Sequence, residues 1–175
     1  TNILATHEVF EACKKNNIPV LVTSTSEVYG DPKVMPQSET YWGNVNPIGI
    51  RACYDEGKRA AETLFTDYHR QYNLDTRIVR IFNTFGPRMA LNDGRVVSNF
   101  IAQALRGEPI TIYGDGNQTR CFAHVYDVID AVISIAFAKN TIGKVVNIGN
   151  DFEISISGLA RKIIEETESK SQVVY

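Results

Sequence analysis

Short apolar runs rich in β-branched residues alternate along this chain with longer segments of helical periodicity, and this alternation is what most limits the fold. The apolar runs are predicted strands at residues 19–23, 76–82 and 145–148. Predicted helices surround them at residues 3–15, 51–72 and 127–138, the last with Asp127 as its N-cap. Strands that alternate with helices build a parallel sheet covered on both faces. The sequence therefore predicts an α/β fold with a doubly wound parallel sheet.

The middle of the chain interrupts this alternation. A predicted helix over residues 96–106 ends at Gly107. Short strands at residues 110–113 and 120–124 then flank a turn at residues 114–117, as in a hairpin. Open α/β sheets bind their ligands beyond the carboxyl ends of the strands. We therefore expect these pieces to form a small substrate-binding lobe at that edge.

The ends of the chain suggest a segment of a longer protein. Thr1 rather than Met begins the sequence, and residues 171–175 are typical of a strand cut short. Before this last strand, Ser155 or Ser157 is a candidate N-cap for a final helix.

Composition excludes several classes of function. The formal net charge is -2, so no strongly basic surface is available to attract nucleic acid or an anionic membrane. No apolar run is long enough to span a bilayer. The three cysteines, Cys13, Cys53 and Cys121, lie far apart, which predicts neither a disulfide framework nor a zinc site and favours a reducing compartment. We expect a protein without a bound metal ion.

The strongest chemical signal is a tyrosine four residues before a lysine. Residues 54–58 read YDEGK, near the start of a predicted helix, and this spacing puts Tyr54 and Lys58 on one helix face. An ammonium beside a phenol favours the phenolate, so Tyr54 is suited to take a proton from a hydroxyl group. The same spacing also occurs by chance on exposed helix surfaces. Here the hydroxyl-rich residues 23–26 follow a predicted strand directly, which favours a catalytic site.

Together these motifs resemble the extended short-chain dehydrogenase/reductases that act on nucleotide sugars. The shared pattern is TSEVYG at residues 25–30, then the Tyr54–Lys58 pair, RIFNTFGPR at 80–88 and QTRCF at 118–122. Finer details resemble the UDP-glucuronate decarboxylases, above all YWGNVNPIGIRACYDEGKR at residues 41–59. The resemblance implies part of a Rossmann-type sheet and NAD as cofactor. It also implies a homodimer through the helix at residues 51–72.

The resemblance implies roles for named residues. Tyr54 is the expected catalytic base and Lys58 its partner, which also holds the nicotinamide ribose, while Thr25 orients the reacting oxygen. Ser26 and Glu27 complete the expected catalytic set, and Glu27 either positions the sugar or mediates a proton transfer after carboxylate loss. Related dehydratases carry Asp-Glu at these two positions, and serine does not replace the acid that protonates a departing hydroxyl. The expected cofactor contacts besides Tyr54 and Lys58 are Thr84, Arg95 and Thr1. The expected substrate contacts are Asn83, Arg88, Tyr113 and Arg120.

The last four residues have separate expected roles. Arg120 suits the diphosphate because a guanidinium matches phosphate geometry as a fork. Tyr113 is expected against the uracil ring. Arg88 is interpreted either as a phosphate contact or as a structural partner of an acid, and both interpretations stay open.

The expected activity is NAD-dependent decarboxylation of UDP-glucuronate to UDP-xylose through a 4-keto intermediate. The alternatives are a nucleotide-sugar 4,6-dehydratase or 4-epimerase, and a non-catalytic truncated module. The absence of a Gly-x-x-Gly-x-x-Gly turn, the usual pyrophosphate site, favours the non-catalytic module for this 175-residue chain.

The resemblance also implies domain limits and a location. Residues 1–93 and 125–150 are assigned to the C-terminal part of an NAD-binding Rossmann domain, and residues 94–124 and 151–175 to part of a nucleotide-sugar-binding lobe. The expected compartment is the cytoplasm, or the Golgi lumen if a longer parent carries an N-terminal anchor.

Overall fold

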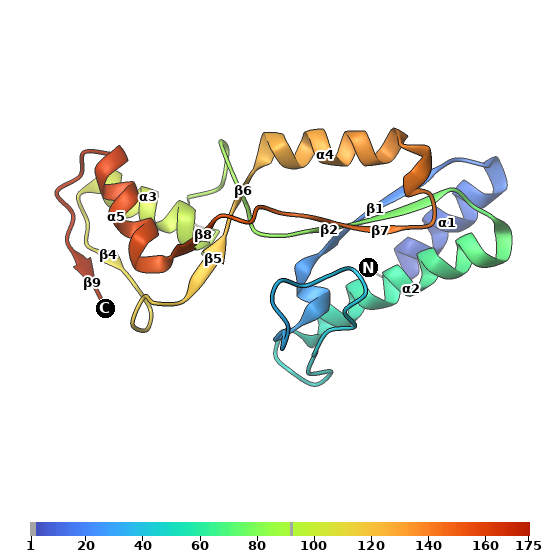
Figure 1. Cartoon of the computed structure of the whole chain (residues 1–175), viewed down its shortest axis with the longest axis horizontal. Coiled ribbons are helices and arrows are strands. Elements are labelled where there is room, and N and C mark those ends of the chain that lie inside the picture. Colours follow the sequence, from blue (N-terminus) through green and yellow to red (C-terminus); the bar gives the residue numbers. More distant parts are fainter. Residues whose placement is uncertain (1–2, 92) are drawn as a thin grey trace. The chain divides into compact units, whose positions relative to one another are not determined.

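The computed structural model describes residues 3–91 and 93–175. The chain divides into two compact units, each with its own core (Figure 1). The first consists of Thr1–Phe82 and Asp127–Ile148, and the second of Asn83–Tyr126 and Gly149–Tyr175.

A three-stranded parallel sheet forms the centre of the first unit. Strands β1 (Val20–Thr25), β2 (Thr76–Ile81) and β7 (Val145–Ile148) lie in the order β1-β2-β7. Their carboxyl ends are level, because Thr25 pairs with Ile81 and Ile81 pairs with Ile148. The predicted parallel α/β sheet is therefore confirmed.

Helices cover both faces of this sheet, as predicted. Helices α1 (Leu4–Asn16) and α2 (Ala52–Tyr72) lie on one face and α4 (Val125–Phe137) lies on the other (Figure 1). Short helix η2 (Lys139–Thr141) follows α4. The core on the α1–α2 side consists of Phe10, Phe65, Tyr68, Leu74 and Ile78. Full burial of a Phe, Leu or Ile side chain in such a core stabilises the fold by roughly 1.5–3 kcal/mol.

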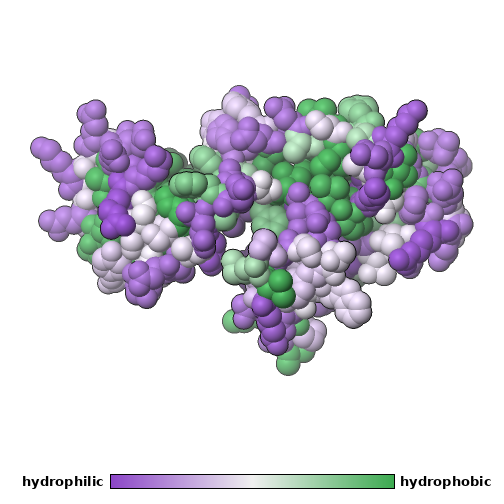
Figure 2. All heavy atoms as spheres, in the orientation of Figure 1, coloured by the Kyte–Doolittle hydropathy of each residue, from purple (hydrophilic) through white to green (hydrophobic). Residues whose placement is uncertain are grey.

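Helix α4 leaves an apolar stripe exposed. Of its residues only Val128 is buried, whereas Ile129, Ile133 and Phe137 are exposed at helical spacing. Figure 2 shows the corresponding apolar surface over α4.

The second unit packs two helices against three short strand pairs. Helices α3 (Val96–Arg106) and α5 (Ile156–Glu166) share one apolar core. The parallel pairs are β3 (Thr84–Phe85) with β6 (Ala123–His124) and β4 (Ile110–Thr111) with β9 (Val173–Val174). The antiparallel pair is β5 (Thr119–Cys121) with β8 (Glu153–Ser155).

Of three local predictions about turns and helix caps, two are wrong and one is confirmed. The predicted hairpin around residues 114–117 is wrong, because β4 pairs with β9 and β5 pairs with β8 instead of with each other. Asp127 is not an N-cap, since α4 begins at Val125 and Asp127 lies in its first turn. Ser155 is confirmed as the N-cap of α5, where its hydroxyl accepts a hydrogen bond from the Gly158 N–H at 3.0 Å.

The loop over residues 30–50 is ordered by close backbone packing. It follows the short helix η1 (Ser26–Tyr29) and returns so that Gly30 forms a bridge with Asn44. Gly30 has φ +64°, and a Cβ added there would lie 2.3 Å from the Asn44 carbonyl oxygen. The loop therefore requires glycine at this position.

No helix in the described residues is both long and apolar enough to cross a membrane.

Candidate active site

The five predicted catalytic residues lie together in the first unit. Strand β1 ends at Thr25, η1 begins with Ser26 and Glu27, and α2 carries Tyr54 and Lys58. The fold brings them together because the strand ends at the edge of the sheet where α2 begins its passage along the sheet face.

Direct contacts join the strand end to the helix. The Lys58 Nζ donates a hydrogen bond to the Thr23 carbonyl oxygen at 3.0 Å. The same nitrogen lies 6.0 Å from the centre of the Tyr54 ring. Tyr54 is 38% exposed, so part of this residue is open to solvent. Thr25 is the N-cap of η1, and its hydroxyl accepts a hydrogen bond from the Glu27 N–H at 3.3 Å.

Arg51 is a site residue that the sequence analysis missed. Its guanidinium forms an ion pair with Glu27 at 3.1 Å and lies 6.0 Å from the Tyr54 ring centre. In the sequence, its position three residues before Tyr54 was the feature that could have pointed to Arg51. A charged residue at the start of a helix is too common for that position to identify a site residue. The structure therefore surrounds Tyr54 with two cations, Lys58 and Arg51, the second paired with Glu27.

A cleft of about 520 Å³ opens beside this ion pair. Its lining consists of Glu27, Gly30, Asp31, Asn44, Val45, Asn46, Gly49, Arg51, Ala52 and Asp55. One Asp55 carboxylate oxygen, Oδ1, is buried without a hydrogen-bond partner among the described residues. Buried acceptors are normally satisfied. Asp55 Oδ1 is an exception to this rule among the described residues.

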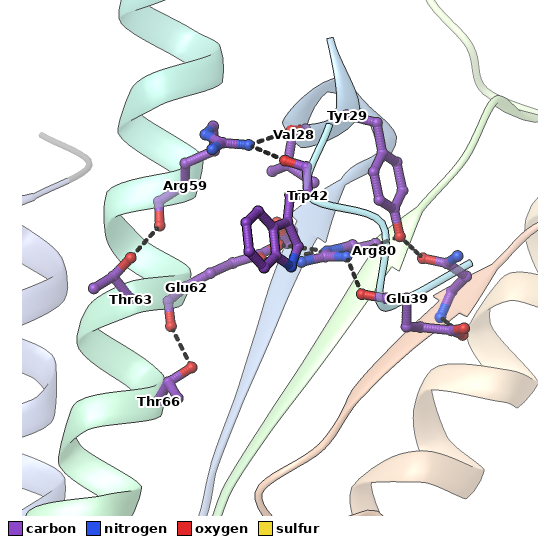
Figure 3. Close-up of polar contacts among 11 residues, drawn as sticks. Val28, Tyr29, Glu39, Trp42, Arg59, Glu62, Thr63, Thr66 and Arg80 are labelled. Atoms are coloured by element: carbon purple, nitrogen blue, oxygen red, sulfur yellow. Dashed lines mark hydrogen bonds and ion pairs between the residues drawn. The ribbon is translucent and has the colours of Figure 1, made fainter. Parts of the chain in front are cut away.

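Two arginines hold the loop over residues 30–50 against the sheet and α2 (Figure 3). The Arg59 guanidinium donates to the carbonyl oxygens of Val28 and Trp42, at 2.8 and 2.9 Å. The Arg80 guanidinium forms an ion pair with Glu62 at 2.6 Å and donates to the Glu39 carbonyl oxygen at 3.1 Å. The segment that leads to Tyr54 is thus fixed by charged hydrogen bonds.

The predicted cofactor and substrate residues after position 82 lie in the second unit. Thr84 is on β3, and Asn83 donates from Nδ2 to the Cys121 carbonyl oxygen at 3.4 Å. Arg95 is the N-cap of α3 and pairs with Asp93 at 3.6 Å. Their proposed ligand contacts remain predictions. Thr1, the third predicted cofactor contact, lies outside the described residues.

The three remaining predicted substrate residues are also in this unit. Tyr113 is 85% exposed, as a stacking platform must be before a ligand binds. The Arg120 guanidinium is exposed and donates to the carbonyl oxygen of the preceding Thr119 at 2.7 Å. Arg88 has φ +70° and takes part in none of the ion pairs among the described residues. The structural pairing considered for Arg88 therefore finds no support.

Within residues 3–91 and 93–175, no cluster of three or more His, Cys, Asp or Glu side chains is arranged to hold a metal ion.

Comparison with known families decides the assignment. The profile of the NAD dependent epimerase/dehydratase family matches residues 1–149. The chain belongs to this family. The motif resemblance is thereby confirmed, and the Rossmann-type fold is confirmed by the similar solved structures described below.

Within the epimerase/dehydratase family, curated decarboxylases are similar to this chain in sequence. UDP-glucuronic acid decarboxylase 3 from Arabidopsis thaliana is 54% identical over 165 residues, which is 94% of this chain and 48% of that protein. UDP-glucuronic acid decarboxylase 1 from Xenopus tropicalis is 51% identical over 175 residues, or 100% of this chain and 41% of that protein. The chain thus spans less than half the length of these relatives.

Solved structures of family members share the fold. UDP-glucose 4-epimerase from Thermotoga maritima, solved with UDP-glucose, has a TM-score of 0.89 and 29% identity. All of this chain and 56% of that one are covered. UDP-glucuronic acid 4-epimerase from Bacillus cereus, solved with UDP-glucuronic acid and NAD, has a TM-score of 0.84 and 29% identity over 99% of this chain and 54% of that one.

Proposed function

We propose that the full-length protein containing this chain decarboxylates UDP-glucuronate to UDP-xylose with NAD as cofactor. The observation that carries the proposal is the set of Thr25, Tyr54 and Lys58 at one strand end, with Ser26 and Glu27 beside it. Identities of 50–55% to UDP-glucuronic acid decarboxylases over nearly the whole chain support it.

In the proposed mechanism, Tyr54 acts as base toward the 4-hydroxyl of the sugar. The Lys58 ammonium stabilises the phenolate, and the Thr25 hydroxyl orients the 4-oxygen by a hydrogen bond. When bound, NAD supplies the redox chemistry by taking the hydride from C4 and later returning it.

The sugar is then a β-keto acid, which loses its carboxylate readily. The bond between C5 and the carboxylate carbon breaks, carbon dioxide leaves, and the electron pair moves into the 4-ketone to give an enolate. Glu27 mediates delivery of a proton to C5, where it replaces the lost carboxylate, and Tyr54 gives its proton back to the 4-oxygen when the ketone is reduced again. No hydroxide leaves, so the step needs no acid at Ser26. A serine is therefore compatible with decarboxylation, whereas elimination of water requires a proton donor at that position.

The residues of this chain fit one end of the cofactor. Tyr54 is exposed, and Lys58 keeps further N–H donors besides the one given to Thr23, so both suit the hydroxyls of the nicotinamide ribose. The chain has no Gly-x-x-Gly-x-x-Gly turn for the pyrophosphate. We therefore expect the isolated 175-residue chain to bind NAD+ poorly in equilibrium dialysis, and micromolar binding would contradict this.

The nucleotide of the substrate is assigned to the second unit. Tyr113 offers an exposed ring for the uracil, Arg120 offers a guanidinium for the diphosphate, and Asn83 and Arg88 are further candidates. Thr84 and Arg95 are proposed cofactor contacts. The homodimer through α2 is likewise proposed, and native mass spectrometry of the full-length protein tests it.

Product analysis separates this function from the alternatives within the family. The full-length protein, given UDP-glucuronate and NAD+, should release carbon dioxide and form UDP-xylose, as detected by mass spectrometry. Given a nucleotide-linked glucose, it should form no 4-keto-6-deoxy product. A C4 epimer of UDP-glucuronate without carbon dioxide would identify a 4-epimerase, which the similar solved epimerases make the second candidate. A 6-deoxy ketone would identify a dehydratase.

A further inference from the structure

One face of α2 carries a third polar residue in line with the proposed catalytic pair. Tyr54, Lys58 and Glu62 follow one another at intervals of four, so all three point to the same side of the helix. Lys58 donates to the Thr23 carbonyl oxygen of β1 at 3.0 Å. One turn later, the Ser24 hydroxyl of β1 donates to Glu62 Oε1 at 2.5 Å. The helix is thus attached to consecutive residues of the strand that ends at Thr25.

Glu62 is also the partner of an arginine on the neighbouring strand. Arg80 Nε donates to Glu62 Oε1 at 3.0 Å and Arg80 Nη2 donates to Oε2 at 2.6 Å, a two-point fork. The side chains of Arg80 and Glu62 are 12% and 11% exposed. Burial alone would lower the pKa of Arg80, but its hydrogen bonds to Glu62 and Tyr29 and the charge of Glu62 outweigh burial and raise it.

The polar network crosses the whole sheet at one level. Ser24, Arg80 and Asn147 are register partners on β1, β2 and β7. Arg80 Nη1 donates to the Tyr29 hydroxyl at 2.8 Å, and that hydroxyl donates to Asn147 Oδ1 at 2.8 Å. The Asn147 N–H donates to the Glu39 carboxylate at 2.8 Å. The row therefore links α2, three strands, η1 and the loop over residues 30–50 (Figure 3).

A buried ion pair is by itself a weak source of stability compared with apolar packing. Replacing a buried ion pair by well-packed apolar side chains is often neutral or stabilising, whereas breaking it by removing one partner is costly. What a forked ion pair adds over an apolar contact is direction, because both nitrogens and both oxygens must align. A helix held in this way cannot slide along the strand without breaking the fork.

We propose that Glu62 and Arg80 are positioning residues for the active site: their fork fixes the register of α2 along β1 and so sets the place of Tyr54 relative to Thr25. The proposal rests on the assignment of Tyr54 as the base. Glu62 lies eight residues from Tyr54, about 12 Å along a rigid helix, so a displacement at Glu62 carries through to the phenol. A misplacement of about 1 Å at reacting groups lowers turnover by about 100-fold.

The test separates positioning from stability with an apolar triple variant, Ser24→Ala/Glu62→Met/Arg80→Met, in the full-length protein. It removes the Glu62 carboxylate together with both side chains that donate to it, so it should melt closer to the wild type than the single variant Glu62→Gln. Its kcat should nevertheless fall at least ~10-fold while KM stays within ~2-fold. The conservative variant Arg80→Lys keeps the charge without the fork, and should lose kcat with little change in melting temperature.

Arg77 supplies the matched control. It lies three residues before Arg80 on β2, with a side chain that is 5% exposed, and it pairs with Asp75. Its other partners are Thr141 and the Ala138 carbonyl oxygen, away from α2. Arg77→Met should lower the melting temperature and leave kcat unchanged at a temperature where the variant is folded. A triple variant with wild-type kcat, or an Arg77→Met loss of kcat equal to that of Arg80→Lys, would overturn the proposal.

An NMR measurement without substrate tests this proposal separately from the proposed function. The chain is labelled with 13C in its tyrosine rings, and the Tyr54 signal is assigned with Tyr54→Phe. At constant pH this signal should move or broaden in the triple variant and in Arg80→Lys, and stay in place in Arg77→Met. A Tyr54 signal that stays in place in both the triple variant and Arg80→Lys would refute the positioning role of Glu62 and Arg80, whatever activity the enzyme proved to have.

Discussion

Gly30→Ala should destabilise the first unit by more than the free energy needed to force alanine into the backbone conformation of Gly30. Gly30 has φ +64° and ψ -132°, a conformation that side chains rarely adopt. A Cβ there would lie 2.3 Å from the carbonyl oxygen and 2.7 Å from the carbonyl carbon of Asn44. Both are backbone atoms, so no side-chain rotation relieves the contact. The loop must move away at Asn44, which also lines the cleft.

The magnitude follows from two contributions. A residue forced into such a backbone conformation costs about 1–3 kcal/mol. Overpacking by one methyl group costs about 1–3 kcal/mol more. We therefore expect Gly30→Ala to lower the free energy of unfolding by roughly 3 kcal/mol or more. As the matched control, Asn73→Ala places alanine at φ +52° where a Cβ already exists, so only a conformational cost of about 1 kcal/mol remains.

Urea denaturation followed by circular dichroism measures both variants. The expected result is a difference of at least about 1.5 kcal/mol between Gly30→Ala and Asn73→Ala, with equal m-values. Equal losses in the two variants would refute the argument, because they would show that the close contact with Asn44 contributes nothing.

Three further outcomes are expected. Tyr54→Phe in the full-length protein should abolish turnover without changing the melting temperature, and a near-normal kcat would remove Tyr54 as base. Arg120→Ala should weaken UDP binding by about 1.5–3 kcal/mol in calorimetry, the scale of a lost charged hydrogen bond, and an unchanged affinity would exclude it from the site. Burial, and then the Glu11 hydrogen bond, raises the pKa of Tyr68 to about 12. The stability that the raised pKa contributes is fully present below pH ~10, the ordinary pKa of tyrosine, and is lost as the pH rises through 12. The free energy of unfolding should therefore fall less between pH 10 and 12 in Tyr68→Phe than in the wild type.

Periodicity and capping residues were sufficient to predict most elements of the fold. The helix over residues 96–106 and the strand over residues 145–148 have the predicted limits. These elements are specified locally, by the spacing of apolar residues and by Gly107 after the first of them. The order of the strands in the sheet was not predictable in the same way, because it depends on contacts between distant segments.

The wrong hairpin shows this limit. Residues 110–113 and 120–124 surround glycines and look like hairpin arms, but β4 and β5 pair with strands that follow residue 150. Local turn chemistry allows a hairpin without requiring it, and burial of the α3–α5 core selects the other pairing. The early start of α4 at Val125 has a similar origin, since helical backbone can begin before a plausible capping residue.

For the candidate active site, the sequence alone was enough to predict the chemical groups: a phenol and an amine one helical turn apart, and hydroxyls after an apolar strand. Those groups could be identified because their spacing is local. That Arg51 pairs with Glu27, and that Glu62 and Arg80 attach helix α2 to the sheet, became visible in the folded structure alone. Glu62 and Arg80 lie 18 residues apart on different elements. The sequence shows two common charged residues, and packing of α2 on β1 and β2 is what excludes water and makes them partners.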